Sequence, residues 1–136
     1  MLLTAIMTKL PVKIYYRDTD CGGVVYYANY LDYFERGRTE FMAERGVDIT
    51  ATAREGIKFI VRSASVEYLS PARYGDTIIV ETSLGEMKGA SFSFLYEVTC
   101  SSTGKTLVRG ETLVACIDGE LRPRRIPPDI VSRLKN

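Results

Sequence analysis

The sequence contains no histidine. Imidazole is the commonest nitrogen ligand of protein-bound metals and the base of Ser-His-Asp and Cys-His nucleophile systems, so these classes of site are excluded. Dehydration chemistry that depends on histidine is disfavoured for the same reason. Acid–base work in this chain must therefore fall to Asp, Glu, Lys, Tyr or Cys side chains.

Cysteine is also scarce. The three cysteines, Cys21, Cys100 and Cys116, lie far apart and form no CxxC pair. An odd number in this pattern favours a reducing compartment, and we expect a cytoplasmic protein. Cys21 follows Asp20 and could be taken for a nucleophile, but an adjacent carboxylate disfavours the thiolate and no histidine or nearby lysine favours it. We interpret Cys21 as a small loop residue.

Neither sign of charge dominates, and no long hydrophobic run is present. Lys and Arg number 18 against 17 Asp and Glu, without a run of five like charges. Nothing in the charge therefore indicates a nucleic-acid partner. The apolar segment 1–11 has no basic residue before its apolar part and is too short to span a bilayer, so we expect neither a signal peptide nor an integral membrane segment. The length of 136 residues fits a single domain, 1–136.

The stretch 25–45 predicts a long amphipathic helix. Its apolar or small residues follow helical spacing: Tyr27, Tyr30, Leu31, Phe34, Gly37, Phe41 and Met42. Gly37 in this apolar face would allow the helix to lie close against a sheet. Asp18 and Asp20 stand just before the helix, whose unpaired first-turn N–H groups suit a developing oxyanion. A carboxylate and oxyanion donors are thus expected in one place.

Segments of β character surround this helix. Residues 11–17 precede it, and further strands are expected at 58–70, 76–88, 91–101 and 105–118. Short helices are expected at 47–56 and after Pro127. The pattern predicts an α+β fold with one long helix packed across an antiparallel sheet. The free sheet edge and the uncovered sheet face predict a homo-oligomer.

The motif of residues 16–30, YRDTDCGGVVYYANY, resembles the signature of the 4-hydroxybenzoyl-CoA thioesterase family. It is closest to the YbgC-type branch, the acyl-CoA thioesterases associated with the Tol–Pal cell-envelope system. The resemblance continues through 35–40, 66–73, Asp76 and 122–127, and so covers nearly the whole chain. It implies the hotdog fold, hydrolysis of an acyl-CoA thioester without a cofactor or metal, and assembly as a dimer or a dimer of dimers, that is, a homotetramer.

The resemblance also implies roles for particular residues. The second Asp of the motif, Asp20, corresponds to the catalytic carboxylate, and the backbone N–H of Tyr27 to the group that caps the thioester carbonyl. Many relatives carry His where this chain has Tyr27, so any contribution of that imidazole is lacking. The expected substrate-binding residues are Gly22, Gly23, Val24, Ile60, Val61, Arg62, Ser63, Lys88 and Arg122. Residues 60–63 would come from a partner chain, and Lys88 and Arg122 would contact the phosphates of CoA.

Several alternatives stay open. Asp20 could act as a general base on water or attack directly to form a mixed anhydride. Asp18 and Asp20 could instead only bind turn amides, or form a DxD metal site, although no nucleotide-binding βαβ pattern accompanies them. The alternative function is a non-catalytic hotdog protein that binds acyl-CoA or an envelope or lipid-synthesis partner. Acyl carrier protein is the alternative carrier of the acyl group.

Overall fold

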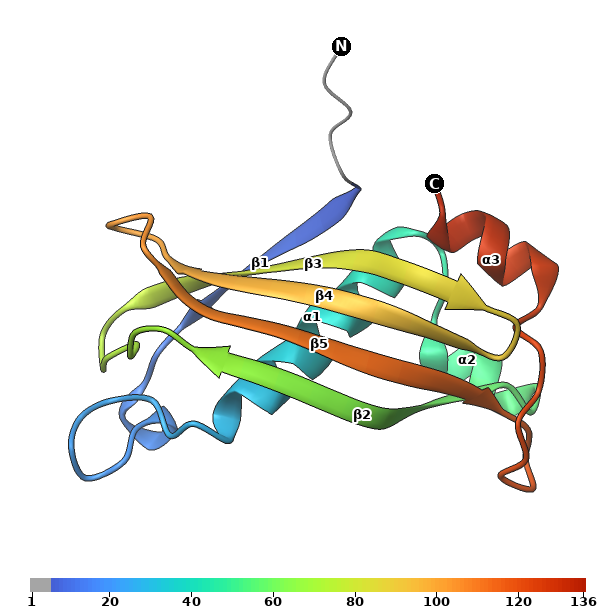
Figure 1. Ribbon diagram of the computed structural model, residues 1–136, viewed down its shortest axis with the longest axis horizontal. Helices are drawn as coiled ribbons and strands as arrows, with labels where there is room; N and C mark the ends of the chain where they lie inside the picture. The colour runs from blue at the N-terminus through green and yellow to red at the C-terminus, as the bar shows by residue number, and fades with distance from the viewer. Residues whose placement is uncertain (1–5) are drawn as a thin grey trace, which may run out of the picture.

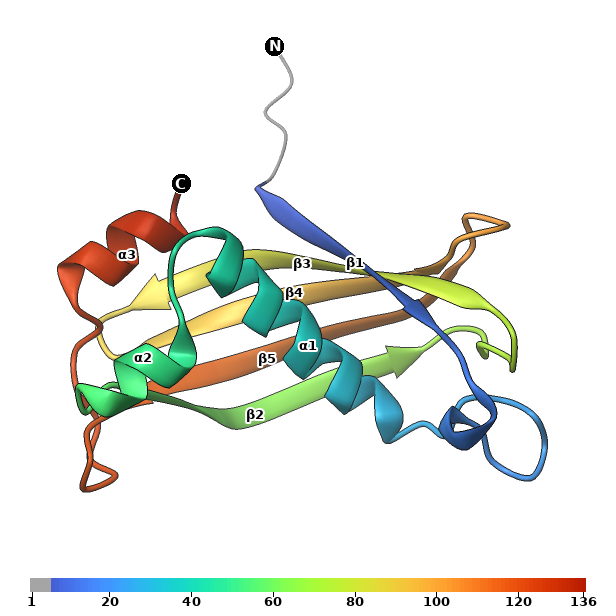
Figure 2. The ribbon, with the colours of Figure 1, turned by 180° about the vertical axis from the view of Figure 1, so that it is seen from behind.

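A five-stranded antiparallel sheet carries the long helix α1 across one of its faces (Figures 1 and 2). The computed structural model describes residues 6–136. The strand order is β1-β3-β4-β5-β2, so β1 and β2 form the two edges. The elements are β1 (Met7–Lys13), a 3₁₀ turn η1 (Tyr16–Asp18), α1 (Asn29–Glu44), α2 (Ile49–Arg54), β2 (Lys58–Tyr68), β3 (Thr77–Lys88), β4 (Ser91–Cys100), β5 (Thr106–Ile117) and α3 (Pro128–Leu134). The predicted α+β arrangement is confirmed.

The core lies between α1 and the inner face of the sheet. Alternate residues of β4 are buried, as a strand with one covered face requires: Phe92, Phe94, Tyr96, Val98 and Cys100. Phe34 of α1 stacks on Tyr96 with ring centroids 4.2 Å apart. The predicted apolar helix face was wrong at Leu31, which is exposed. Tyr33 is buried although the helical pattern did not include it.

Gly37 brings α1 close to the sheet, as the sequence predicted. A methyl group at this position would collide with Thr82 Oγ1 and lie 3.1 Å from Val80 Cγ1. Gly110 has the same role on β5, because a side chain there would collide with the ring of Phe34. Two glycines thus set the distance between helix and sheet.

Two elements have other bounds than expected. The strand predicted at 11–17 runs from Met7 to Lys13, and residues 16–18 form η1 instead. Asp18 causes this turn, since its Oδ2 accepts the N–H of Tyr15 at 2.8 Å. The helix predicted from residue 25 begins at Asn29. Val25 cannot start it, because its N–H donates to Ala72 O at 2.8 Å in an extended bridge.

The other predicted strands and short helices are confirmed with small shifts at their ends. Of the N-terminal segment 1–11, residues 1–5 lie outside the described residues and Met7 onward forms β1. Over residues 6–136, every helix is too short or too polar to traverse a bilayer. Helix α1 covers one face of the sheet, while the opposite face, toward the viewer in Figure 1, carries no helix of the described chain.

Candidate active site

The loop of residues 19–28 joins η1 to α1 and carries most of the motif. Thr19 and Val25 pair as a short bridge across the base of this loop. The N–H of Asp20 donates to Val24 O at 2.9 Å, which closes a tight turn. Val24 also pairs with Arg73, so the loop is fastened to the segment before β3. These backbone contacts hold an exposed loop in a defined conformation.

The carboxylate of Asp20 is oriented by its own turn. Its Oδ1 accepts the N–H of Gly22 at 2.8 Å. Gly23 has a φ of +79°, a backbone conformation that residues other than glycine rarely adopt. The second oxygen, Oδ2, accepts no hydrogen bond from any residue within 6–136. Asp20 thus presents one anchored and one free oxygen toward solvent, an arrangement suited to taking a proton or attacking a carbonyl.

Asp18 is bound to the framework instead. Besides its carboxylate contact with Tyr15, its carbonyl oxygen accepts the N–H of Tyr26 at 3.1 Å and the side-chain amide of Asn29 at 2.8 Å. Burial raises the pKa of Tyr33, and the negative charge of Asp18 raises it further. These contacts tie the first turn of α1 to η1, which agrees with a structural role for Asp18.

Tyr27 lies two residues before α1, so the prediction that it belongs to the first helical turn was wrong. Its backbone N–H donates no hydrogen bond to any described residue, and the same holds for Ala28. Both peptide planes are nevertheless fixed. Tyr26 O accepts the N–H of Asn29 at 2.9 Å, and Tyr27 O accepts the hydroxyl of Tyr68 at 3.2 Å. Two free donors are therefore held in position just before the helix.

Tyr68 is a residue whose role the sequence did not reveal. It is the last residue of β2, and its ring packs edge-on against Tyr27 and Tyr30, with centroids 6.1 and 5.7 Å away. Tyr27, Tyr30 and Tyr68 line a cavity of about 270 Å³, together with Val25, Leu69, Ser70 and Pro71. The hydroxyl of Tyr68 donates to the carbonyl oxygen of Tyr27, 41 residues earlier in the chain, and no sequence pattern indicates such a pair.

Residues 60–63 lie in the exposed edge strand β2. The register with β5 shifts between Val61 and Ser63, so Arg62 is the extra residue of a β-bulge. Bulges of this kind are frequent beside active sites. Ile60 and Val61 line a second cavity, of about 320 Å³, between β2 and the Glu35–Met42 side of α1. This cavity is lined by other residues than the tyrosine cavity around Tyr27.

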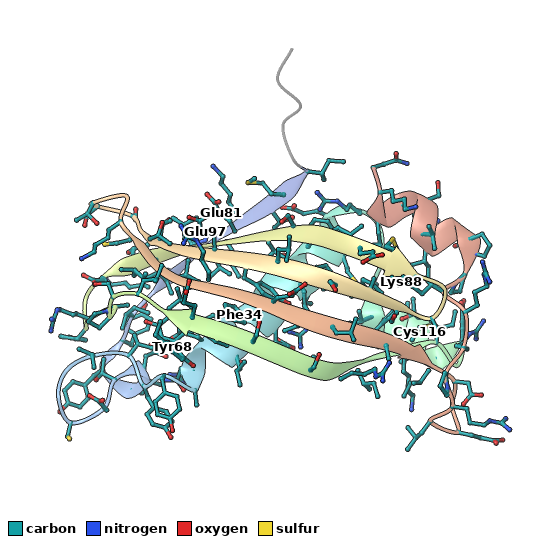
Figure 3. All side chains as sticks on the ribbon, in the orientation of Figure 1. Phe34, Tyr68, Glu81, Lys88, Glu97 and Cys116 are labelled. Atoms are coloured by element: carbon teal, nitrogen blue, oxygen red, sulfur yellow. The ribbon has the colours of Figure 1, made fainter. Side chains whose placement is uncertain are left out.

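The two candidate phosphate ligands are exposed and already paired with carboxylates. Lys88 Nζ is 3.5 Å from Glu86, and Arg122 contacts Asp118 at 3.3 Å and Glu120 at 3.0 Å. Backbone N–H groups of Arg122 and Glu120 lower the pKa of Asp118, so this partner stays ionised. Lys88 lies at the opposite end of the sheet from Tyr68 (Figure 3).

One chain therefore brings together only part of the predicted set. Asp20, Gly22, Gly23, Val24 and Tyr27 share one loop. Residues 60–63 stand on the edge strand, and Ile60 and Val61 line a different cavity. Lys88 is separated from the loop by the length of the sheet (Figure 3). Strand β2 is an edge of the sheet and, among residues 6–136, pairs with β5 alone.

Known proteins resemble this chain over nearly its whole length. The family model of the thioesterase-like superfamily matches residues 15–134. The acyl-CoA thioester hydrolase YbgC of Escherichia coli is 36% identical over 134 residues, which are 98% of this chain and 99% of that protein.

Two solved structures share the fold. A probable thioesterase from Bartonella henselae superposes with a TM-score of 0.82 at 32% identity, over 90% of this chain and 100% of that one. A 4-hydroxybenzoyl-CoA thioesterase in complex with 4-hydroxybenzoyl-CoA superposes with a TM-score of 0.87 over 96% of this chain and 99% of that one. At 19% identity this second likeness concerns the fold alone.

Proposed function

Because this chain belongs to the thioesterase-like superfamily, we propose that it hydrolyses the thioester of an acyl-CoA to the free acid and CoA. The chain is a thioester hydrolase with the hotdog fold. The observation that carries the proposed acyl-CoA hydrolysis lies in the Asp20 loop. An oriented carboxylate with a free oxygen and two free backbone N–H groups stand on one fastened loop.

Asp20 is the catalytic carboxylate of this proposal. As a general base it takes a proton from water while the water oxygen bonds to the thioester carbon; the C–S bond then breaks and the thiolate of CoA takes a proton. As a nucleophile it bonds to the same carbon itself and expels the thiolate, and water hydrolyses the resulting anhydride. The free Oδ2 of Asp20 supports both routes.

The N–H of Tyr27 stabilises the oxyanion that forms on the carbonyl oxygen in either route. It needs no rearrangement, because the peptide plane between Tyr26 and Tyr27 is already fixed by Asn29. Donors oriented before the reaction contribute more than donors that must first reorient. In this mechanism the phenol of Tyr27 forms part of the pocket wall and does not take part in the chemistry.

The complete site is shared between two chains. Edge strand β2 has eleven residues and pairs only with β5 within the described chain. Such a long free edge is a template for pairing with another strand. If two β2 strands pair antiparallel about a two-fold axis, the Lys58 end of one lies beside the Tyr68 end of the other. Residues 60–63 of one chain then approach the Asp20 loop of its partner.

The same two-fold axis brings the phosphate ligands within reach. Lys88 lies far from Tyr68 in its own chain, but at the end that the partner's Tyr68 approaches (Figure 3). Lys88 and Arg122 of one chain would then bind the phosphates of a CoA whose thioester lies at Asp20 of the other. Phosphate would compete with Glu86 and Glu120 for these cations, and exposed pairs of this kind are weak.

A thiol-release assay with a panel of acyl-CoA thioesters tests this function. Hydrolysis of one or more of them supports it. Saturable binding without release of thiol would favour the alternative, a non-catalytic hotdog protein that binds acyl-CoA or an envelope or lipid-synthesis partner. Faster release from acyl carrier protein than from CoA would assign that carrier.

The cysteines of residues 6–136 are all free thiols, which supports a cytoplasmic location.

A further inference from the structure

The cavity of about 320 Å³ between α1 and the edge strand β2, called here the helix–strand cavity, combines apolar walls with charge. Helix α2 lies beside the start of β2 and contributes to the lining (Figure 2). The apolar lining includes Met42 of α1, Ile49 and Ala53 of α2, and Phe59, Ile60 and Val61 of β2. The charged lining residues are Glu35, Arg38 and Lys58.

The charges of the helix–strand cavity do not neutralise one another. No carboxylate of residues 6–136 comes within 4.0 Å of the side-chain nitrogens of Arg38 or Lys58. Glu35 is exposed, and its carboxylate forms no ion pair with any residue that the structure describes. Two cations against one carboxylate leave the lining with a net charge of +1.

Arg38 is the less exposed of the two cations, since it is half-buried whereas Lys58 is exposed. Burial raises the pKa of Tyr96 in the core, and the hydrogen bond with Thr112 and the guanidinium of Arg38 offset part of that rise. The charge of Arg38 therefore acts on the buried side of the cavity. A charge that is partly removed from water costs free energy unless a counter-ion accompanies it. An anion inside the helix–strand cavity would supply that counter-ion.

Given the proposed hydrolysis of acyl-CoA, on which this inference rests, we propose that the helix–strand cavity binds the far end of the acyl group and selects one that ends in a carboxylate. The substrate is then a CoA monothioester of a dicarboxylic acid. The apolar walls contact its methylene chain, and Arg38 binds the terminal carboxylate. A guanidinium can donate two parallel hydrogen bonds to a carboxylate, which an ammonium group cannot match. Lys58 adds a second, exposed positive charge.

The two-chain site places this cavity next to the reacting thioester. In that arrangement residues 60–63 of one chain approach the Asp20 loop of its partner. Ile60 and Val61 also line the helix–strand cavity, and they are 46% and 42% exposed. An acyl group held at the partner's loop thus passes these two side chains on its way to Arg38. An acyl group without a terminal carboxylate leaves the guanidinium without a counter-ion, and this difference discriminates between the two substrates.

Paired CoA thioesters test the proposal. At each chain length, the thiol-release assay compares the monothioester of a dicarboxylic acid with the thioester of the monocarboxylic acid of equal carbon number. The measured quantity is the ratio of their kcat/KM values. The wild type should give a ratio above one at the chain length that brings the carboxylate to Arg38. In Arg38→Met this ratio should fall by about 10–100-fold, the factor that a hydrogen bond to a charged group contributes.

Three variants serve as comparisons. Arg38→Lys keeps the charge and should keep most of the ratio. Arg36→Met is the matched control, because Arg36 lies on the same helix, pairs with Asp32 at 2.8 Å and does not line the helix–strand cavity. Its ratio should equal that of the wild type. Lys58→Met removes an exposed cation at the first residue of β2, and its ratio should fall by about two- to fivefold.

The outcomes separate this inference from the proposed function. Hydrolysis of the monocarboxylic series with a ratio of one or less at every chain length overturns the inference and leaves acyl-CoA hydrolysis in place. Hydrolysis of neither series refutes the proposed function itself. An Arg38→Met protein with an unchanged ratio and a smaller particle mass shows that Arg38 binds a carboxylate of another copy, which also overturns the inference. If Arg38→Met does not fold, an unchanged ratio in folded Lys58→Met does the same.

Discussion

Replacing Tyr68 with Phe tests whether the peptide plane that carries the free N–H of Ala28, the second candidate oxyanion donor, is held in place for catalysis. The change removes one hydroxyl, which donates to Tyr27 O at 3.2 Å, and keeps the ring contacts with Tyr27 and Tyr30. A hydrogen bond of this kind contributes about 0.5–1.5 kcal/mol. If that energy is lost only in the transition state, the turnover number falls by a factor of about 2–12.

The effect on stability should be small by comparison. Tyr68 is 48% exposed, so water replaces the lost partner in the free protein. The assay is therefore a comparison of kcat, KM and the unfolding temperature. We expect kcat to fall while KM and the unfolding temperature change little. Tyr74→Phe is the matched control, because Tyr74 is also exposed and packs edge-on against Tyr16 at 5.9 Å. Equal kcat values for both variants would refute this positioning role.

Variants at three further positions address the same site and its support. Tyr27→Phe and Tyr27→His should keep substantial thiol release. Folded Tyr27→Pro should lose about 10²–10³-fold in kcat, because it lacks the N–H donor. Loss of activity in Tyr27→Phe but not in Tyr27→His would assign the chemistry to the side chain. Gly37→Ala should unfold at a lower temperature than the wild type. Overpacking against Thr82 costs about 1–3 kcal/mol and exceeds the helix-propensity gain of about 1 kcal/mol. A higher unfolding temperature would show that α1 can move away from Thr82. Asp18→Asn should lower the unfolding temperature, because it weakens the hydrogen bond from the N–H of Tyr15, while thiol release persists. Loss of thiol release at an unchanged unfolding temperature would make Asp18 catalytic.

Much of the fold was predictable because its signals are local. The period-2 pattern of β4 and the helical spacing of Phe34, Gly37 and Phe41 follow from which face of each element is buried. Helix α2 begins after Asp48, whose side chain accepts the N–H of Thr50 at 2.9 Å, an ordinary N-cap signal. At α2 the boundary depends on neighbours in sequence, and there the pattern and the structure agree.

The misplaced start of α1 has a non-local cause. The predicted helix began at Val25, but Val25 is held extended by Ala72, which lies 47 positions later in the chain. The bulge at Arg62 likewise depends on the register between β2 and β5. The Asp20 loop could be identified from its motif, whereas the Tyr68 contact that orients its backbone could not. Tertiary pairing decides these features, and one sequence does not encode it in a readable pattern.

The turnover of purified Asp20→Asn tests the central claim most directly. Asn is nearly isosteric and its amide oxygen can still accept the N–H of Gly22, so the loop should keep its conformation. It can neither take a proton from water efficiently nor form an anhydride. Against the acyl-CoA that the wild type hydrolyses fastest, thiol release should fall by about 10²–10⁴-fold at an unchanged unfolding temperature. Wild-type turnover by the folded variant would contradict the assignment of Asp20 as the catalytic carboxylate.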